Sequence, residues 1–284
     1  MIAVRLEGRL GNQLFQYAFI YATAKKLGVK FYLDQSLQPF LLDEYFEVDQ
    51  SPYQFLQKQF FSIRGYKNLF SYYLKNAFYS TLKKIFGLYH INFSNTVTPS
   101  EELKKLRNGA FYTGFFQSEQ YFEQHTSDIA QQFTIKPYYK QQYQHVREQL
   151  PGDKTMVVIH IRRGDYLSLN YNLPDSYYHE AIKNIKAAHP FYIFISDDPD
   201  HVKAEFAYLA NKYVSFNSEI VDFQLLQNAD VCILSNSSFS WWGAWLNSKN
   251  DKQVYAPEYW IGFTEKKEFP AGIFNNLNFT CLTV

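Results

Sequence analysis

Two arginines follow the most apolar run of the sequence. Residues 155–161 read TMVVIHI, and Arg162 and Arg163 come directly after them. Such a run predicts a strand buried in an α/β sheet, so both guanidinium groups should project from the sheet edge at which the strand ends. A guanidinium offers a planar fork of N–H donors that matches two phosphate oxygens, and it stays charged at any working pH. The sequence therefore predicts an anion site, suited to a pyrophosphate, at this edge.

Two more polar loops follow predicted strands. The loop SDD, 196–198, comes after FYIFI, and the loop SNSSFSWWGAW, 235–245, comes after DVCIL. Ligands bind at the carboxyl ends of strands in open α/β sheets. Ser237 and Ser238 lie just before a predicted helix, where hydroxyls and backbone N–H groups can bind a phosphate. Ordinary N-capping is the alternative for these serines.

Several acids near these loops could act on a ligand or could serve the fold. Asp222 can accept paired hydrogen bonds from the N–H and amino groups of guanine, or it can simply favour a helix dipole. Asp198-Pro199-Asp200 spells the D-x-D string by which some glycosyltransferases hold a metal ion, but the proline favours N-capping of a helix by Asp198. Asp165, in the string RGD, is expected to fix an arginine through an ion pair.

Strand and helix patterns alternate along the chain. Up to residue 150 the predicted strands are 2–6, 29–33 and 110–116, and the predicted helices are 14–27, 119–132 and 138–150, with a turn over 8–13. Beyond it the predicted strands are 155–161, 191–195, 230–234 and 253–255, and the predicted helices are 175–188, 199–207, 218–228 and 239–246. This alternation predicts parallel sheets with right-handed crossovers. The Pro151-Gly152-Asp153 turn predicts a boundary between domains 1–150 and 151–284.

The composition excludes several classes of protein. The 284 residues carry a net charge of +1, which gives no general attraction to nucleic acid. The charged N-terminus does not resemble a signal peptide, and no apolar run approaches the ~20 residues of a membrane helix. Cys232 and Cys281 are the only cysteines, so we expect a reducing cytosol, inert buried thiols and neither a disulfide framework nor a zinc site.

The stretch 50–100 is basic and aromatic. It contains no acidic residue and six lysines or arginines. Such a segment could lie weakly against anionic lipid headgroups, but the charges are spread along the chain, which favours solvated helices.

The combination of motifs resembles glycosyltransferase family 11, the bacterial α-1,2-fucosyltransferases. The motifs are HIRRGDY (160–166), SDD (196–198) and SNSSFSWWGAWL (235–246), together with GRLGNQLFQYA (8–18). The resemblance implies an α/β protein of GT-B type, with two Rossmann-like domains facing across a cleft. Domain 1–150 would lie on the acceptor side, and domain 151–284 would bind GDP-fucose.

The resemblance also implies an activity. It is transfer of L-fucose from GDP-β-L-fucose, with inversion and without a metal or other cofactor, to the 2-hydroxyl of a terminal β-galactose. The acceptor would belong to an O-antigen or another surface glycan, free or lipid-linked, and the enzyme would be cytoplasmic. A fucosyltransferase of different linkage, or a non-catalytic sugar-binding module, is the alternative. The sequence lacks the G-x-G-x-x-G motif of a dehydrogenase after its first predicted strand, and it lacks the G-x-x-x-x-G-K-[ST] motif of a P-loop kinase. Both classes are therefore disfavoured.

Roles for individual residues also follow from the resemblance. Arg162 would bind the β-phosphate and Asn12 would orient donor or acceptor, and we expect both to be catalytic. The remaining donor-binding residues would be Gly11 in the N-terminal loop, His160 and Asp222 at the guanine, Arg163 and Asp165 beside Arg162, Asp198 in the middle motif, and Ser237 and Ser238 at the phosphate. No general base is assigned, since the stretch 167–173 holds no acid.

Overall fold

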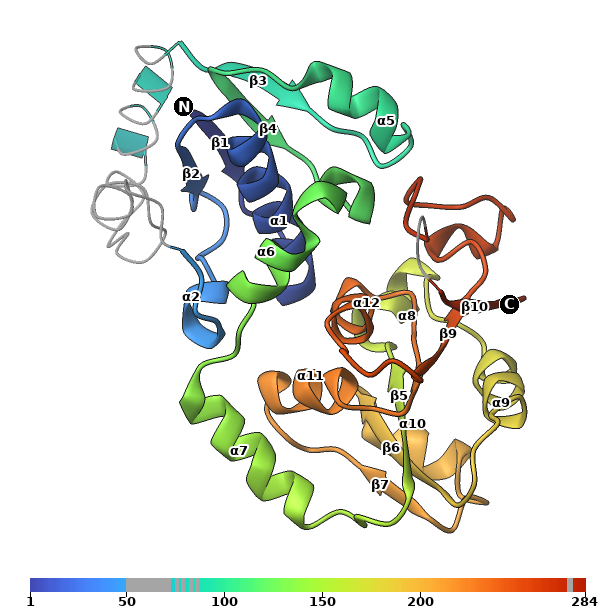
Figure 1. Cartoon of the computed structure of the whole chain (residues 1–284). Coiled ribbons are helices and arrows are strands. Elements are labelled where there is room, and N and C mark those ends of the chain that lie inside the picture. Colours follow the sequence, from blue (N-terminus) through green and yellow to red (C-terminus); the bar gives the residue numbers. More distant parts are fainter. Residues whose placement is uncertain (50–72, 75–76, 78–79, 82–83, 85–86, 275–277) are drawn as a thin grey trace. The chain divides into compact units, whose positions relative to one another are not determined.

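The chain folds into two compact units, drawn in Figure 1. The computed structural model describes residues 1–49, 73–74, 77, 80–81, 84, 87–274 and 278–284. The first unit comprises Met1–Thr134 with Ala271–Asn275, and the second comprises Ile135–Pro270 with Asn276–Val284. The predicted boundary turn at 151–153 lies inside the second unit. The reason is that helix α7, Pro137–Glu148, packs against helix α11, Glu219–Gln227, of that unit, where Gln224 Nε2 donates to the carbonyl of Tyr139 at 3.0 Å.

The first unit is built on a four-stranded parallel sheet in the order β2-β1-β4-β3. Its strands are β1 Ile2–Arg5, β2 Phe31–Asp34, β3 Tyr89–Asn92 and β4 Ala110–Thr113. The predicted strands near 2–6, 29–33 and 110–116 are thus present, whereas β3 was not predicted. Its YHIN sequence lies at a sheet edge and is largely exposed, so it lacks the apolar pattern by which a strand is recognised.

Helix α1, Leu10–Leu27, is the central helix of the first unit and is buried on nearly every side. Phe19 stacks on Phe116 with ring centroids 3.8 Å apart and also contacts Phe93 and Tyr112. Gly28 ends the helix in the left-handed conformation, with φ of 63°, as predicted for a C-terminal cap. The helix starts four residues before the predicted residue 14, so much of the predicted 8–13 turn is helical.

The other helices of the first unit whose bounds lie within the described residues are short. They are α2 Leu42–Tyr45, α5 Pro99–Glu102, the 3₁₀ turns η1 Leu103–Lys105, η2 Glu119–Tyr121 and η3 Glu123–His125, and α6 Thr126–Gln132. The single helix predicted over 119–132 is therefore wrong in its first half. Phe122 leaves helical geometry between the two 3₁₀ turns, and its ring is buried. Most of the basic aromatic stretch 50–100 lies outside the described residues.

The second unit is built on a six-stranded parallel sheet in the order β10-β9-β8-β5-β6-β7. Its strands are β5 Thr155–Ile161, β6 Pro190–Ser196, β7 Lys212–Val214, β8 Val231–Ile233, β9 Gln253–Pro257 and β10 Thr280–Leu282. Strand β5 has the predicted bounds and lies between β6 and β8. The short strands β7 and β10 were not predicted, because a three-residue strand carries little periodicity.

The helices of the second unit follow the predicted order. Besides α7 they are α8 Gly164–Leu169, α9 Asp175–Lys183, α10 Pro199–Glu205, α11 Glu219–Gln227, α12 Ser238–Trp245 and the 3₁₀ turn η4 Ile261–Phe263. Tyr177 and Tyr178 of α9 and Phe206 after α10 pack in one core cluster with Val157 and Ile159 of β5. Helix α8 is an addition to the predicted elements, and it begins directly after the two arginines.

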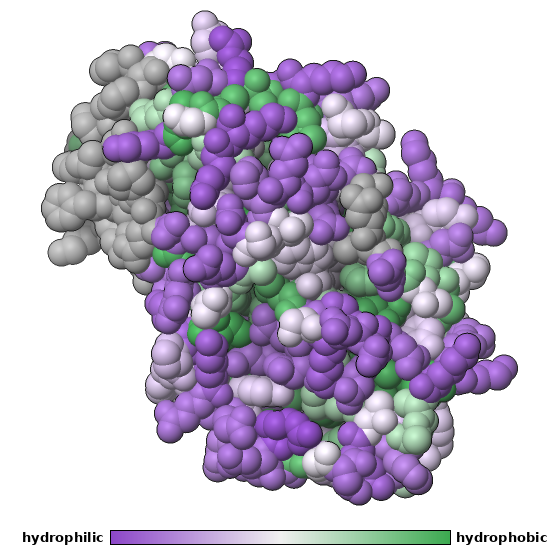
Figure 2. All heavy atoms as spheres, in the orientation of Figure 1, coloured by the Kyte–Doolittle hydropathy of each residue, from purple (hydrophilic) through white to green (hydrophobic). Residues whose placement is uncertain are grey.

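Polar residues cover much of the surface. In Figure 2 they are purple, and they separate smaller green apolar areas on the face that is shown. Among the described residues, no helix combines the length and apolar character needed to cross a bilayer. Cys232 is buried as expected, whereas Cys281 is exposed, so the prediction of two buried thiols is wrong for the second.

Candidate functional site

Three polar loops meet at one edge of the second sheet. Ile161 at the end of β5 pairs with Ser196 at the end of β6, and Ile159 pairs with Ile233 at the end of β8. Because the strands are parallel, the loops that follow them leave the same edge. The register therefore brings the arginine loop, the SDD loop and the serine loop together, as the sequence predicted.

Arg162 is held by two carboxylates. One guanidinium nitrogen, Nη2, donates to Asp165 Oδ1, and the other, Nη1, lies 2.7 Å from Asp197 Oδ2. The arginine side chain is 17% exposed, and its guanidinium carbon lies 5.6 Å from the ring centroid of Tyr166. The ion pair predicted for Asp165 is present. These contacts use only part of the five N–H donors, so a fixed guanidinium can still bind an anion.

Asp197 is the residue that the sequence analysis missed. Its Oδ1 accepts hydrogen bonds from the backbone N–H of Arg163 at 2.8 Å and of Gly164 at 3.2 Å, while its Oδ2 pairs with Arg162. A Cβ on Gly164 would lie 2.5 Å from that Oδ2, so a larger residue there would displace the carboxylate. The two adjacent acids in the SDD motif could have indicated both residues, but the sequence analysis assigned a role only to Asp198.

Asp198 links the second arginine to helix α10. Arg163 Nε donates to Asp198 Oδ2 at 3.0 Å, and the N–H of His201 donates to Asp198 Oδ1 at 3.2 Å. The hydrogen bond from Arg163, followed by the one from His201, lowers the pKa of Asp198. The predicted N-capping role of Asp198 is confirmed. Asp200, the other acid of the D-x-D string, is 90% exposed and pairs with Lys203.

His160 is buried beneath the same edge. Its Nδ1 lies 2.7 Å from Ser235 Oγ, and its ring centroid lies 5.4 Å from that of Phe239. Burial lowers the pKa of His160 to about 4, so the imidazole is neutral near pH 7. A neutral imidazole has one N–H donor and one acceptor nitrogen, which suits hydrogen bonding to an uncharged heterocycle.

Asp222 lies in the first turn of α11. Ser215 Oγ donates to Asp222 Oδ1, and Asn217 Nδ2 donates to Ser215 Oγ at 2.8 Å. Burial raises the pKa of Asp222 to about 7, despite the hydrogen bonds from Ser215 and Asn217 that lower it. The neighbouring Phe223 contacts Phe239, which in turn contacts His160, so a shared aromatic contact connects the acid's helix to the histidine.

Ser237 and Ser238 lie where α12 begins. Ser237 occupies the N-cap position, but its hydroxyl makes no capping hydrogen bond. Its carbonyl instead accepts from Trp241 N and from Ser240 Oγ, both at 3.0 Å. A partly exposed hydroxyl beside the first N–H groups of a helix is an arrangement that can bind an anion.

Gly11 and Asn12 lie in the first turn of α1, which corrects the prediction of a loop at these residues. Gln117 Nε2 donates to Asn12 Oδ1 at 3.1 Å, and the Asn12 side chain packs against Gly8 so closely that a Cβ there would clash. Gly8 also has a φ of 76°. Gln117 and Gly8 therefore fix the orientation of the Asn12 amide, while its role toward a donor or acceptor stays a prediction.

Two buried glutamines of the same motif join the loops of the first unit. Gln16 accepts from the N–H of Glu7 at 3.0 Å and donates to the carbonyl of Gly114 at 3.1 Å. Gln13 donates to the carbonyl of Pro39 and accepts from the N–H of Leu41, both at 2.9 Å. Both glutamines are 0% exposed, so part of GRLGNQLFQ serves the fold. The sequence analysis did not separate these residues from the site residues.

Two units, each built on a parallel sheet, are the architecture of an α/β protein of GT-B type, and comparison with known proteins gives the family. The model of Glycosyl transferase family 11 matches residues 1–268, so the chain belongs to that family and is a glycosyltransferase. Two relatives come from Escherichia coli. An alpha-1,2-colitosyltransferase is 28% identical, over 95% of each chain. The O-antigen biosynthesis glycosyltransferase WbnK is 29% identical, over 96% of this chain and 99% of the relative.

Solved structures share the fold at low sequence identity. NodZ, an alpha-1,6-fucosyltransferase known from Bradyrhizobium and soaked with GDP-fucose, gives a TM-score of 0.54 at 12% identity, covering 86% of this chain and 92% of NodZ. POFUT1 in complex with GDP-fucose gives 0.52 at 12% identity, covering 90% of this chain and 97% of POFUT1. These likenesses support the GT-B fold that the sequence predicted.

Proposed function

We propose that this glycosyltransferase transfers L-fucose from GDP-β-L-fucose to the 2-hydroxyl of a terminal β-galactoside, with inversion and without a metal ion. The observation that carries the proposal is the guanidinium of Arg162 at the end of β5, held by Asp165 and Asp197 in a chain of family 11. Structures of the same fold, NodZ and POFUT1, were solved with GDP-fucose, which supports a GDP-sugar donor here.

Arg162 would supply the main electrostatic catalysis. When the anomeric bond breaks, positive charge develops on the sugar and additional negative charge develops on the GDP. A guanidinium directed at the β-phosphate stabilises this charge more in the transition state than in the ground state. Arg162 is suited to this role because its two carboxylate partners already fix its orientation, so little reorganisation is needed when the donor binds.

The neighbouring residues would bind the rest of the donor. Asp222 as a carboxylate would accept from the ring N–H and amino group of guanine, with the neutral His160 beside it. Ser237 and Ser238 would contact the diphosphate at the start of α12. Arg163, Asp165 and Asp198 would maintain the arginine loop, while Gly11 and Asn12 would contact the donor or acceptor. No carboxylate is proposed as the general base.

The proposed acceptor and linkage are inferred from the two relatives. One relative is described as an alpha-1,2-colitosyltransferase and the other as an O-antigen biosynthesis glycosyltransferase, which supports a 1,2-linkage in a surface glycan. We propose that this glycan is a lipid-linked precursor made in the cytoplasm. The colitosyltransferase also makes a colitosyl donor the second candidate. Its 28% identity is the observation that favours this alternative.

One experiment tests donor, linkage and metal together. The purified chain is incubated with GDP-fucose or a GDP-colitose donor and a panel of β-galactosides, with and without excess chelator, and the product linkage is determined by NMR. We expect fucose on the 2-hydroxyl of galactose at equal rates with and without chelator. Transfer from the colitosyl donor alone, a different linkage, or loss of activity in chelator would contradict the corresponding part of the proposal.

A further inference from the structure

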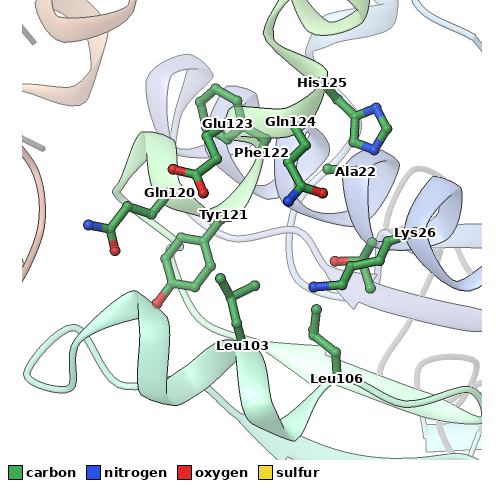
Figure 3. A pocket seen from close by; sticks show the side chains of 11 residues that line it. Ala22, Lys26, Leu103, Leu106, Gln120, Tyr121, Phe122, Glu123, Gln124 and His125 are labelled. Atoms are coloured by element: carbon green, nitrogen blue, oxygen red, sulfur yellow. The ribbon is translucent and has the colours of Figure 1, made fainter. Parts of the chain in front are cut away.

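The described residues of the first unit form a small pocket between α1, η1 and the η2–η3 turns, which Figure 3 shows with its lining side chains. The volume of this pocket is about 50 Å³, which gives room for a few water molecules but not for a sugar ring. Small-molecule sites usually measure about 300 Å³ or more. The contacts that bear on a ligand lie instead in the second unit, where the arginine loop meets the serine loop.

Two hydrogen bonds connect helix α8 and the segment after it to the serine loop. Tyr166 Oη donates to the carbonyl of Asn236 at 3.3 Å, and Asn236 Nδ2 donates to the carbonyl of Tyr171 at 2.8 Å. The two tyrosine rings also meet edge to face, with their centroids 6.0 Å apart. We refer to Tyr166, Tyr171 and Asn236 as the tyrosine clip.

The backbone after α8 is shaped so that the clip can form. Asn170 ends the helix with a φ of 54°, in the left-handed conformation that asparagine tolerates better than most residues. The chain turns back at this point, and Tyr171 N donates to the carbonyl of Tyr166 at 3.0 Å. The turn therefore brings the Tyr171 carbonyl close to Tyr166, where Asn236 contacts both residues.

Asn236 contributes its N–H donor to the serine loop. The residue is 0% exposed, and its Oδ1 has no hydrogen-bond partner among the described residues, whereas its Nδ2 binds Tyr171. An unpaired buried carbonyl oxygen is unfavourable, so this side chain is better suited to holding the clip than to filling space. Ser237 and Ser238 follow it directly in the sequence. Asn236 therefore joins the α8 segment to the start of the serine turn.

Tyr166 connects the same loop to Arg162. Asp165 and Asp197 hold the two terminal nitrogens of the guanidinium, and the guanidinium carbon lies 5.6 Å from the Tyr166 ring centroid. A cation within ~6 Å of an aromatic ring is attracted to the face of that ring. Burial raises the pKa of Tyr166, so its hydroxyl stays protonated and donates to Asn236. Tyr166 thus contacts the arginine through its ring and the serine loop through its hydroxyl.

Pairing of β5 with β8 ends before the residues of the site. The last pair is Ile159 with Ile233, so Arg162 lies three residues beyond the pairing and Ser237 lies four residues beyond it. One diphosphate can contact both groups only if the two loops keep a fixed separation. A misplacement of about 1 Å in a reacting group can cost about 100-fold in rate, so a link between the loops beyond the sheet has a functional effect.

We propose that Tyr166 and Asn236 are positioning residues, which hold the Arg162 guanidinium and the serine loop at the spacing that one diphosphate requires. This role rests on the proposed function, in which Arg162 binds the β-phosphate and Ser237 and Ser238 contact the diphosphate. Without the clip, the guanidinium keeps its charge and its carboxylate partners, but its distance from the serine turn is no longer fixed.

Titration calorimetry tests this role at the phosphates. The full chain is titrated with GDP, GMP and inorganic pyrophosphate. Tyr166→Phe removes the hydroxyl and keeps the ring, whereas Tyr166→Leu removes both. The Kd for GDP should rise at least about threefold in the first variant and at least about tenfold in the second, while the Kd for GMP, which lacks the β-phosphate, should change less than about twofold. Equal losses of GDP and GMP affinity would overturn the proposal.

Asn236→Leu tests the other hydrogen bond of the clip with an apolar side chain of similar shape. It should also raise the Kd for GDP at least about threefold, whereas Tyr138→Phe, at a tyrosine of α7 that is 64% exposed, should leave it unchanged. Tyr166→Phe should unfold within about 4 °C of wild type, because it loses one partly exposed hydrogen bond. Wild-type GDP affinity in Tyr166→Phe would overturn the proposal, whatever the stability of the two leucine variants.

Turnover gives a second measurement. With GDP-fucose as the donor, kcat should fall at least about fivefold in Tyr166→Phe and further in Tyr166→Leu, while the KM for the acceptor stays within about twofold, because Arg162 acts mainly in the transition state. A raised acceptor KM at wild-type kcat would contradict a positioning role at the diphosphate.

The wild-type protein separates this proposal from the proposed function. If wild type binds pyrophosphate but not GDP, the proposed donor is wrong, and the same variants test the clip through pyrophosphate affinity, which should fall as expected for GDP. If wild type binds neither compound, both proposals fail.

Discussion

The two units hold their loops by different chemistry. In the second unit, carboxylates bind arginines: Asp165 and Asp197 hold Arg162, and Asp198 holds Arg163. In the first unit, the amides of Gln13 and Gln16 bind backbone groups of neighbouring loops. The arginine contacts are partly exposed, with Asp165 51% exposed, whereas both glutamines are 0% exposed.

This difference separates function from stability. A partly exposed ion pair contributes little to the free energy of unfolding, but it can direct a charged donor group toward a ligand. A buried amide that satisfies two backbone groups is costly to remove, because both groups then lose their partner in a dry interior. Substitutions at the sheet edge should therefore change activity, and substitutions at the glutamines should change stability.

The largest effect is expected at Arg162. Arg162→Ala should raise the activation barrier for transfer by about 3 kcal/mol or more, a loss of at least ~100-fold in kcat, because the charge on the departing diphosphate is no longer stabilised. Arg162→Lys should also fail, since a single ammonium cannot replace the fork. Steady-state kinetics provides the measurement. Arg107→Ala is the control and should keep wild-type turnover. An Arg162→Ala variant with wild-type turnover would contradict the catalytic role assigned to the arginines at the sheet edge.

The next effect is expected at Gln16. Gln16→Ala leaves the N–H of Glu7 and the carbonyl of Gly114 without their side-chain partner, so the free energy of unfolding should fall by about 2–3 kcal/mol. Urea denaturation measures this change. Gln144→Ala, at an exposed glutamine whose amide donates to Glu148, should change the free energy of unfolding by less than about 0.5 kcal/mol. If the two variants were equally stable, the buried glutamines of the first unit would not have the stabilising role that distinguishes them from the arginine contacts of the second unit.

A smaller effect is expected at Asp197. Asp197→Asn keeps an oxygen for the backbone N–H groups of Arg163 and Gly164 but loses the charge that pairs with Arg162. The arginine is then less well fixed, and kcat should fall about 10- to 100-fold with little change in stability. The matched control is Asp200→Asn, whose side chain is 90% exposed. If the control lost as much activity, the metal-binding interpretation of Asp198-Pro199-Asp200 would regain support.

The smallest effect is a pH dependence at Asp222. Its pKa of about 7 means that the carboxylate required for guanine is a minority form at pH 6 and the dominant form at pH 8. GDP should therefore bind up to about tenfold more weakly at pH 6 than at pH 8. Calorimetric titration measures this difference, and Asp222→Asn should abolish it along with most of the affinity. Constant affinity over this range would contradict the role of Asp222.

The same raised pKa also affects unfolding of the free chain. Because the folded chain binds the proton more tightly than the unfolded chain does, the stability contributed by protonated Asp222 is fully present below about pH 4. It is lost as the pH rises through about 7. Asp222→Asn should remove this part of the pH dependence in thermal melts.

The sequence was sufficient for the elements that carry strong patterns. Strand β5 has its predicted bounds, Gly28 caps α1, and the three polar loops meet because parallel strands end at one edge. The family was also predicted from the motifs. These features depend on residues adjacent in sequence, or on a topology rule that applies to every parallel sheet.

The tertiary structure decided what depends on distant partners. Asp197 became the second carboxylate partner of Arg162 only because β6 pairs with β5, so an acid 35 residues away lies beside the arginine. Similarly, the helix expected over 119–132 breaks where Phe122 enters the core. Local sequence determines which side chains could form a strand, a cap or an ion pair. The folded neighbours determine which of these side chains are buried, paired or exposed, because burial and electrostatic contact depend on distance in space and not on separation along the chain.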